Sequence, residues 1–136
     1  MRSLELTRVY HFSSAHRLEN PALSPEANAA LYGPCARAHG HNYYLEVTVA
    51  GAPHPQTGMA FDLGHLDAVV RDEILERVDH RALESVPDLA AVITTGESLA
   101  RAFWIRLCAK LPARALARVT VVETAKNRFE YRGEST

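Results

Sequence analysis

The sequence predicts an α+β fold in which a four-stranded, largely antiparallel sheet carries two helices on one face. Two early segments alternate apolar with polar residues, two central segments repeat apolar residues every three or four positions, and alternation returns near the C-terminal end. The expected order is β-β-α-α-β-β. Because each helix has a single apolar stripe, both need one sheet surface to bury it. The 136 residues can bury one adequate core, so we expect a single domain over residues 1–136.

The first two strands are expected in the N-terminal part of the chain. From Leu4 to Phe12 four apolar residues stand at even positions, Leu4, Leu6, Tyr10 and Phe12, which predicts a half-buried strand. Alternation resumes from His39 to Val49, where one face carries Tyr43, Leu45, Val47 and Val49. The stretch between them is rich in Pro, Gly, Asn and Ser, so we expect a loop there, and residues 51–58 have the composition of a turn.

Two amphipathic helices are expected next. Asp62 is placed to cap the first helix by accepting from exposed backbone amides. The apolar residues that follow recur at helical spacing: Leu63, Leu66, Val70, Ile74 and Val78. The second helix begins at Thr94 or Thr95 and ends before Leu111-Pro112, and its stripe consists of Leu99, Phe103 and Leu107.

The last two strands follow the second helix directly. Val119, Val121 and Val122 predict the third strand. A short turn over 125–127 then leads into the fourth strand, from Arg128 to Arg132. Cys108, next to the apolar stripe of the second helix, is interpreted as a small core residue without a functional role.

The composition excludes several classes of partner. Lys and Arg total 15 against 16 Asp and Glu, a formal charge of -1, so we expect no nucleic-acid partner. The longest purely apolar run, residues 89–93, is too short to cross a membrane, and charge interrupts the N-terminal segment that a signal peptide would need. The 2 cysteines are too few for a disulfide framework and suit a reducing compartment, so we expect a cytoplasmic location.

Three of the 7 histidines form a candidate metal site. His39 and His41 are two positions apart in a strand, so both imidazoles point to one face. His16 lies just past the first strand and can supply a third nitrogen if the two strands are neighbours. Three imidazoles without a fourth protein ligand are typical of catalytic zinc, whose open position binds water or substrate. The alternative is a pair of polar residues on a solvated face. Solvent exposure explains His11, His54 and His65, which receive no function.

Cys35 precedes His39 by four residues, on a loop that must end beside the candidate metal. A thiol there has two uses. It can be a fourth ligand that closes the site, or a thiolate that acts as a base at neutral pH.

These residues carry a resemblance to the 6-pyruvoyltetrahydropterin synthase and 6-carboxytetrahydropterin synthase family, extending from about Tyr10 to Glu134. The matching stretches are Phe12-Ser13-Ser14-Ala15-His16-Arg17-Leu18, Cys35 with His39-Gly40-His41-Asn42-Tyr43, Thr57-Gly58-Met59 with Asp62-Leu63, Leu66, Val78-Asp79-His80, Thr95-Gly96-Glu97 and Val122-Glu123-Thr124. Several motifs in the same order make chance agreement unconvincing as an explanation.

The resemblance implies a fold and an assembly. The fold is the tunnelling fold (T-fold), in which the sheets of neighbouring subunits join edge to edge into a barrel and the active sites form between neighbours. The assembly would be a homo-oligomer, a hexamer built as a dimer of trimers. Its physical logic is that assembly pairs sheet edges that a lone four-stranded sheet leaves exposed.

The resemblance also implies roles for individual residues. Zinc would be held by His16, His39 and His41, and Cys35 would take a proton from the substrate side chain. Asp79 and His80 would relay protons. The alternative is that His80 only interacts favourably with the dipole at a helix end and that Asp79 is simply exposed. Glu123, as a further catalytic residue, would grip the amino-pyrimidine edge of the pterin. Thr95 and Glu97 would bind substrate, but Thr94-x-x-Glu97 equally fits a capping box at a helix start.

The implied substrate is 7,8-dihydroneopterin triphosphate. Only three residues separate Cys35 from His39, a spacing similar to the carboxy-forming branch of the family. We therefore expect 6-carboxy-5,6,7,8-tetrahydropterin, triphosphate and acetaldehyde as products, on the pathway to 7-deazapurines and queuosine. Leu31-Tyr32-Gly33-Pro34-Cys35 is more similar to the pyruvoyl branch, so triphosphate elimination by a 6-pyruvoyltetrahydropterin synthase is the alternative. A third interpretation is a non-enzymatic domain with structural zinc closed by Cys35. Zinc-assisted hydrolysis would need a carboxylate base, and the sequence has no His-Glu-x-x-His pattern.

Overall fold

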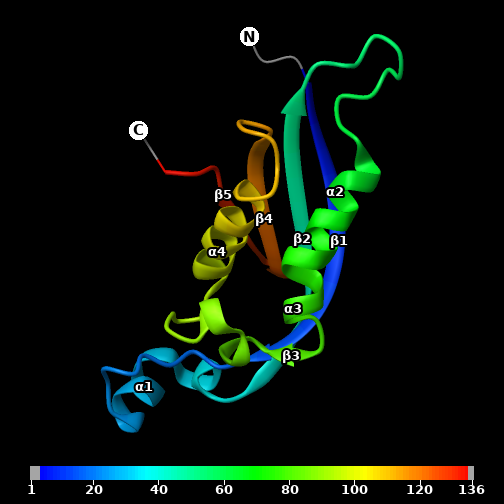
Figure 1. Ribbon diagram of the computed structural model, residues 1–136. Coiled ribbons are helices and arrows are strands. Elements are labelled where there is room, and N and C mark those ends of the chain that lie inside the picture. Colours follow the sequence, from blue (N-terminus) through cyan, green and yellow to red (C-terminus); the bar gives the residue numbers. More distant parts are fainter. Residues whose placement is uncertain (1–3, 135–136) are drawn as a thin grey trace.

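A computed structural model describes residues 4–134 of the chain and confirms the α+β class (Figure 1). Four long strands form its sheet: β1 (Leu4–His16), β2 (His39–Gly51), β4 (Leu116–Thr124) and β5 (Asn127–Tyr131). Each pairs antiparallel with its neighbour, and the full sheet order is β3-β1-β2-β4-β5.

The expected strand number was wrong by one. Within residues 4–134 the sheet has five strands, because β3 (Arg81–Ala82) joins it parallel to β1 opposite Ser14 and Ala15. A strand of two residues has no apolar alternation to detect. Its pairing depends on where the end of the preceding helix, α3, places the following residues.

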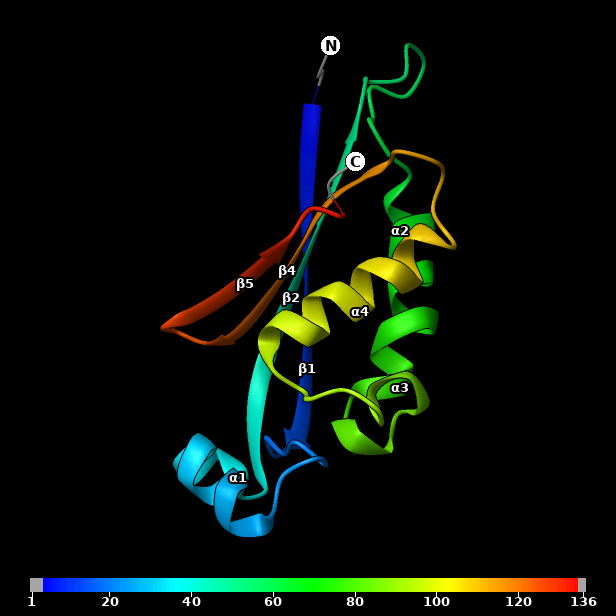
Figure 2. The same cartoon turned by 90° about the vertical axis from the view of Figure 1, so that its left-hand side faces the viewer.

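The two expected helices cover one face of the sheet. The first is a continuous helical stretch made of α2 (Leu63–Val70), a π-helical turn (Arg71–Leu75) and α3 (Glu76–Val78). The predicted cap is confirmed, since Asp62 accepts from the His65 amide at 3.1 Å. The second is α4 (Gly96–Cys108). Figure 2 shows the sheet nearly edge-on, with α2, α3 and α4 all on the same side of it.

A further helix, α1 (Pro25–Tyr32), lies in the segment that we expected to be a loop. Ser24 caps it by accepting from the Ala27 amide at 3.1 Å, and Pro25 occupies its first turn. Proline breaks helix interiors but is favoured at this position, which is why it was misinterpreted as a breaker. The helix buries only Asn28 and projects beyond the end of the sheet (Figures 1 and 2), so its sequence has no apolar stripe that would predict it. A 3₁₀ turn, η1 (Gly33–Ala36), then leads towards β2.

The core lies between the sheet and the helices. The predicted inward residues of β2 are buried: Tyr43, Leu45, Val47 and Val49. Phe12 of β1 stacks on Tyr43, its cross-strand partner, with ring centroids 4.7 Å apart. The predicted stripe of α4 is buried as well: Leu99, Phe103 and Leu107. Cys108 is exposed, so its assignment to the core was wrong; one step round the helix turns it away from the stripe.

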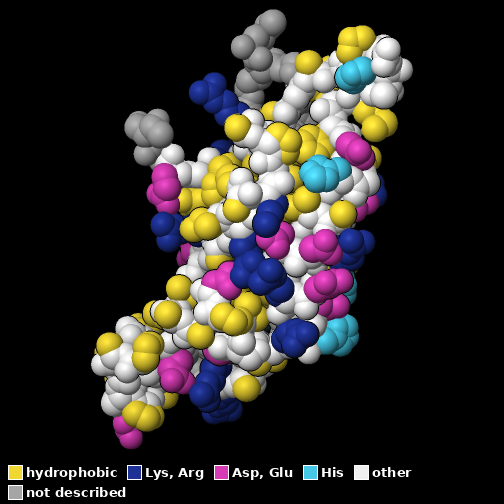
Figure 3. Space-filling view, in the orientation of Figure 1, with side chains coloured by type: hydrophobic (Ala, Val, Ile, Leu, Met, Phe, Trp, Pro, Cys, Tyr) yellow, Lys and Arg dark blue, Asp and Glu magenta, His cyan; other side chains and the backbone are white. Residues whose placement is uncertain are grey.

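The other face of the sheet carries no helix in residues 4–134, and it exposes Val9 and Tyr44. On the helix-bearing face, acidic and basic side chains are interspersed over the helices (Figure 3). None of the helices in the described part of the chain combines the length and the apolar character that crossing a bilayer requires.

Candidate metal centre and active site

The three predicted histidines converge at the end of the sheet where β1 ends and β2 begins. In the β1–β2 register, His16 is opposite His39, and Ser14 is opposite His41. All three imidazoles share the face of Phe12 and Tyr43, because they lie an even number of residues from them. One ring nitrogen from each histidine can be chosen so that the three lie within 4.8 Å of one another.

Hydrogen bonds fix the tautomers of two of these rings. His16 Nδ1 lies 2.8 Å from the backbone oxygen of Thr94, and His39 Nδ1 lies 2.7 Å from that of Arg37. A carbonyl oxygen can only accept, so each Nδ1 carries the proton and donates it. Each Nε2 is left with its lone pair, which is the form that ligates a metal ion.

The surroundings also favour neutral imidazoles. Burial lowers the pKa of His16, and the neighbouring His39 and His41 act in the same direction, against the Thr94 carbonyl. Burial likewise lowers the pKa of His41, while the Glu123 carboxylate opposes this effect. Neutral imidazole is the metal-binding state, so less proton competition is expected here than for exposed histidines. The arrangement fits a divalent ion of the zinc type, which accepts three imidazole nitrogens.

Cys35 lies near this centre in the chain but outside the cluster of ring nitrogens. It is exposed on η1, and its carbonyl accepts from the Leu18 amide at 2.8 Å. This bond holds the loop beside the end of β1. The cluster therefore consists of three ligands, and in residues 4–134 the thiol does not close it as a fourth.

Glu123 faces the cluster from β4. It follows Val119 and Val121 on the inner face, at a point where the β4–β5 register shifts between Val122 and Thr124. Such bulges re-aim side chains beside active sites. Tyr43 lies close by: its hydroxyl is 3.5 Å from His16 Nε2, and burial, with the Glu123 charge second, raises its pKa. Tyr43 was expected only in the core, although its two-residue spacing from His41 already placed it on the histidine face.

Asp79 and His80 form the expected pair, at 3.0 Å between Asp79 Oδ1 and His80 Nδ1, but outside the three-histidine cluster. Both are bonded to Ser13 of β1: its amide donates to Asp79 at 2.9 Å, and its carbonyl accepts from the His80 amide at 2.6 Å. The Ser13 amide also lowers the pKa of Asp79. His80 has φ 59°, and its side chain is 83% exposed, so the pair faces solvent.

Thr95 caps α4, so the alternative of a Thr94-x-x-Glu97 capping box is not formed. Thr95 Oγ1 accepts from the Ser98 amide at 3.3 Å, one residue later than the box requires. Thr94 is instead engaged with His16, as described above, because the segment entering α4 passes the metal-site end of the sheet. Glu97 is exposed in the first turn of the helix. The bond from His16 to Thr94 places the start of α4, including Thr95, beside the cluster.

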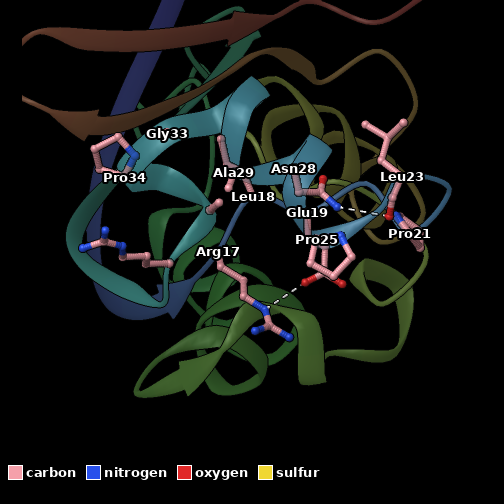
Figure 4. A pocket seen from close by; sticks show the side chains of 12 residues that line it. Arg17, Leu18, Glu19, Pro21, Leu23, Pro25, Asn28, Ala29, Gly33 and Pro34 are labelled. Carbon is pink, nitrogen blue, oxygen red and sulfur yellow. Dashed lines mark hydrogen bonds and ion pairs between the residues drawn. The ribbon is translucent and has the colours of Figure 1, made fainter.

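A hollow of about 630 Å³ lies next to the cluster, between the segment after His16 and the α1–η1 segment. Arg17 and Arg37 help to line it, and Figure 4 shows Arg17 reaching Glu19, at 3.2 Å between Arg17 Nε and Glu19 Oε2. The three histidines are not among its lining residues. The metal centre and this hollow are therefore neighbouring but separate features.

Comparisons with known proteins agree with this geometry. A family model described as 6-pyruvoyl tetrahydropterin synthase matches residues 5–134. A Dictyostelium discoideum protein named 6-pyruvoyl tetrahydrobiopterin synthase is 40% identical over 134 residues, covering 98% of both chains. The solved structure of Caenorhabditis elegans 6-pyruvoyl tetrahydropterin synthase has a TM-score of 0.91 at 34% identity, covering 98% of this chain and 99% of that one. An Aquifex aeolicus protein named 6-carboxy-5,6,7,8-tetrahydropterin synthase is 26% identical over 160 residues, covering 96% of this chain and 98% of that protein.

Proposed function

Because this chain belongs to the 6-pyruvoyl tetrahydropterin synthase family, we propose that it eliminates triphosphate from 7,8-dihydroneopterin triphosphate to leave a 6-pyruvoyl pterin. Membership makes the chain an enzyme of the pterin-synthase class. The observation that carries the specific proposal is the convergence of three imidazoles on the inner face of a fold shared with a 6-pyruvoyl tetrahydropterin synthase.

The pyruvoyl product replaces the carboxy product that the sequence led us to expect. The Dictyostelium discoideum relative named for the pyruvoyl reaction is 40% identical to this chain, whereas the Aquifex aeolicus relative named for the carboxy reaction is 26% identical. The expectation depended on the three-residue spacing between Cys35 and His39. In the structure the bond to Leu18 also holds the Cys35 loop, so spacing alone does not determine how the thiol approaches the substrate. The proposed link to queuosine belongs to the carboxy reaction and is not retained.

We propose zinc as the ion, held by His16, His39 and His41 through the nitrogens that do not donate to the backbone. A bound zinc ion would supply Lewis-acid stabilisation of negative charge on the substrate side-chain oxygens. Cys35 would remove the carbon-bound proton, since its thiol is exposed and the Leu18 bond holds its loop beside the end of β1. Triphosphate is a good leaving group, so proton placement is the main task of the protein.

Pterin recognition is assigned to Glu123, Thr95 and Glu97. Glu123 is close enough to the cluster to influence the pKa of His41, so a pterin gripped by its carboxylate would lie against the histidines. Thr95 is the N-cap of α4 and Glu97 lies in its first turn. The hydrogen bond between His16 and Thr94 holds this end of the helix near the cluster. Thr95 already caps this helix, so substrate binding would be an additional role.

The Asp79–His80 pair would act in a site completed by a second copy of the chain. The pair is exposed, and within the described residues β3 pairs with β1 only at Ser14 and Ala15, so no other strand pairs with that side of β1. A free strand edge favours pairing between subunits. We propose a homohexamer, a dimer of trimers, of single domains spanning residues 1–136, in the cytoplasm, where the free cysteines Cys35 and Cys108 stay reduced.

Product analysis tests this function. Purified enzyme loaded with zinc is mixed with 7,8-dihydroneopterin triphosphate, and the products are identified by mass spectrometry. A pyruvoyl side chain with every substrate carbon retained supports the proposal. Acetaldehyde with a 6-carboxy pterin would establish the carboxy reaction instead. Stoichiometric zinc without turnover would favour a structural metal domain.

A further inference from the structure

Glu84 connects three segments that are distant in the chain. It lies on a 3₁₀ turn (Leu83–Ser85) directly after β3. Its Oε1 accepts from the Thr94 hydroxyl at 3.1 Å and from the Arg17 amide at 2.8 Å. Arg17 is the residue after His16, and Thr94 is bonded to the His16 ring. One carboxylate oxygen of Glu84 thus bonds directly to the main chain next to His16, and through Thr94 it is linked to the His16 side chain.

The direction of these hydrogen bonds can be deduced. A carboxylate only accepts, so the Thr94 hydroxyl must give its single proton to Glu84. The Thr94 oxygen then presents only lone pairs to His16 Nδ1, which lies 3.3 Å away. The Thr94 carbonyl, at 2.8 Å from the same nitrogen, is also only an acceptor. Both contacts require the proton on Nδ1.

Thr94 has no solvent-based alternative, because it is 1% exposed, and His16 is 3% exposed. Water therefore does not compete for the hydroxyl, and a Thr94 hydroxyl released from Glu84 would be free to rotate its proton towards His16. The hydroxyl could then donate to His16 Nδ1 in competition with the Thr94 carbonyl, which would weaken the preference for the tautomer that leaves Nε2 free for a metal.

From this geometry we propose that Glu84 is a positioning residue of the metal centre, acting through Thr94 to hold His16 in its metal-binding tautomer and orientation. The inference rests on the proposed function only in that it takes His16, His39 and His41 to be metal ligands. It concerns metal affinity and ligand geometry, and it is independent of which pterin product forms.

The test measures the zinc dissociation constant by competition with a chromophoric chelator, and the visible absorption spectrum of the Co²⁺-loaded protein. Glu84→Ala and Thr94→Val each break the chain of hydrogen bonds, and zinc binding should weaken by about 10- to 100-fold. Glu84→Gln keeps an acceptor oxygen and loses only the charge, so its loss should be smaller. Thr94→Ser keeps the hydroxyl and should restore affinity close to that of the wild type. Ser85→Ala, on the same 3₁₀ turn, is the control for local disturbance and should bind as the wild type does.

The double variant Glu84→Ala/Thr94→Val should bind zinc about as weakly as either single variant, because both interrupt one path. Shifted Co²⁺ bands are expected in the weakened variants. Unchanged zinc affinity and Co²⁺ spectrum in Glu84→Ala and Thr94→Val, both checked by circular dichroism for a wild-type fold, would overturn the proposal. An equal loss in Ser85→Ala would overturn it too, since the effect would then be general. Failure of the wild type to bind zinc would instead refute the proposed metal centre. This outcome is distinct from a wild type that binds zinc and variants that bind it equally well.

Discussion

His16 and His39 are cross-strand partners at the last register of the β1–β2 ladder, and their ring centroids are 4.5 Å apart. The ladder itself holds the two rings together, so the cluster depends on the most extensively paired strands of the sheet. His41 completes it, with its centroid 4.9 Å from that of His39. Removal of one imidazole should consequently affect the metal far more than the fold.

His39→Ala should reduce zinc affinity by more than the roughly 10- to 100-fold that is usual for changes around a ligand, because it removes a ligand itself. Zinc content after dialysis, measured by atomic absorption, checks this. His54→Ala, at an exposed turn, is the matched control and should keep its zinc. Equal zinc content in the two variants would contradict the assignment of the centre.

Cys35→Ala should retain stoichiometric zinc and a normal thermal transition, while turnover falls by about 100- to 10,000-fold, as expected for loss of an acid–base group. Cys108→Ala removes the other exposed thiol and should remain active. A parallel loss of zinc and stability in Cys35→Ala would show that the sulfur is a ligand, and the structural-zinc alternative would then be preferred.

Mixing two inactive variants should restore activity if the Asp79–His80 pair serves a neighbouring subunit. Cys35→Ala and His80→Ala, refolded together in equal amounts, should regain active sites at about a quarter of the wild-type number, since random assembly unites two intact contributions at that frequency. Turnover of the mixture and of each variant alone gives the comparison. Differently tagged subunits establish that mixed oligomers form; mixed oligomers without activity would place both residues in one subunit's site.

Gly96→Ala should destabilise the protein by about 1–3 kcal/mol, because overpacking strains a filled core. A Cβ on Gly96 would lie 2.0 Å from a ring carbon of Phe129 on β5, so the start of α4 would have to move away from the sheet. Gly64→Ala is the control, since its Cβ would approach only Asp62 Oδ1, at 3.4 Å. Urea denaturation of both variants measures the difference, and a Gly96→Ala protein as stable as the wild type would disprove the close contact.

Asp88→Asn should lower the free energy of unfolding at neutral pH by about 0.5–1 kcal/mol, a value reduced by partial exposure of the pair. Arg106 hydrogen-bonds to Asp88 and lowers its pKa. The folded-state pKa thus lies below the unfolded value of about 3.9, so the stabilisation is complete above that value and is lost as the pH falls through the folded-state pKa.

Wild type and Asp88→Asn should accordingly converge in stability in strong acid. Denaturant titrations from neutral pH downwards provide the measurement. Asp72→Asn, which removes a more exposed partner of Arg71, is expected to change stability less. A difference between wild type and Asp88→Asn that stays constant throughout the titration would exclude the ion pair as its cause.

Features that depend on local periodicity follow from the order of the residues alone. Alternation places residues two apart on one face, so His39, His41 and Tyr43 had to face the core side of β2 in any sheet of this register. Helical spacing similarly determined which side of α4 is buried, and Asp62 had a local reason to cap α2. These predictions required no knowledge of the remaining chain.

Contacts between segments that are remote in sequence depend on how the whole chain packs. His16 bonds to Thr94 across 78 positions, and Glu84 joins both, yet no local pattern links a 3₁₀ turn to a strand end. The same holds for β3, whose two residues pair only where β1 happens to pass. Residues that are far apart in the sequence become partners only when the chain folds back and packs them together. Local spacing therefore determined which face the ligands occupy, and packing determined what holds them there.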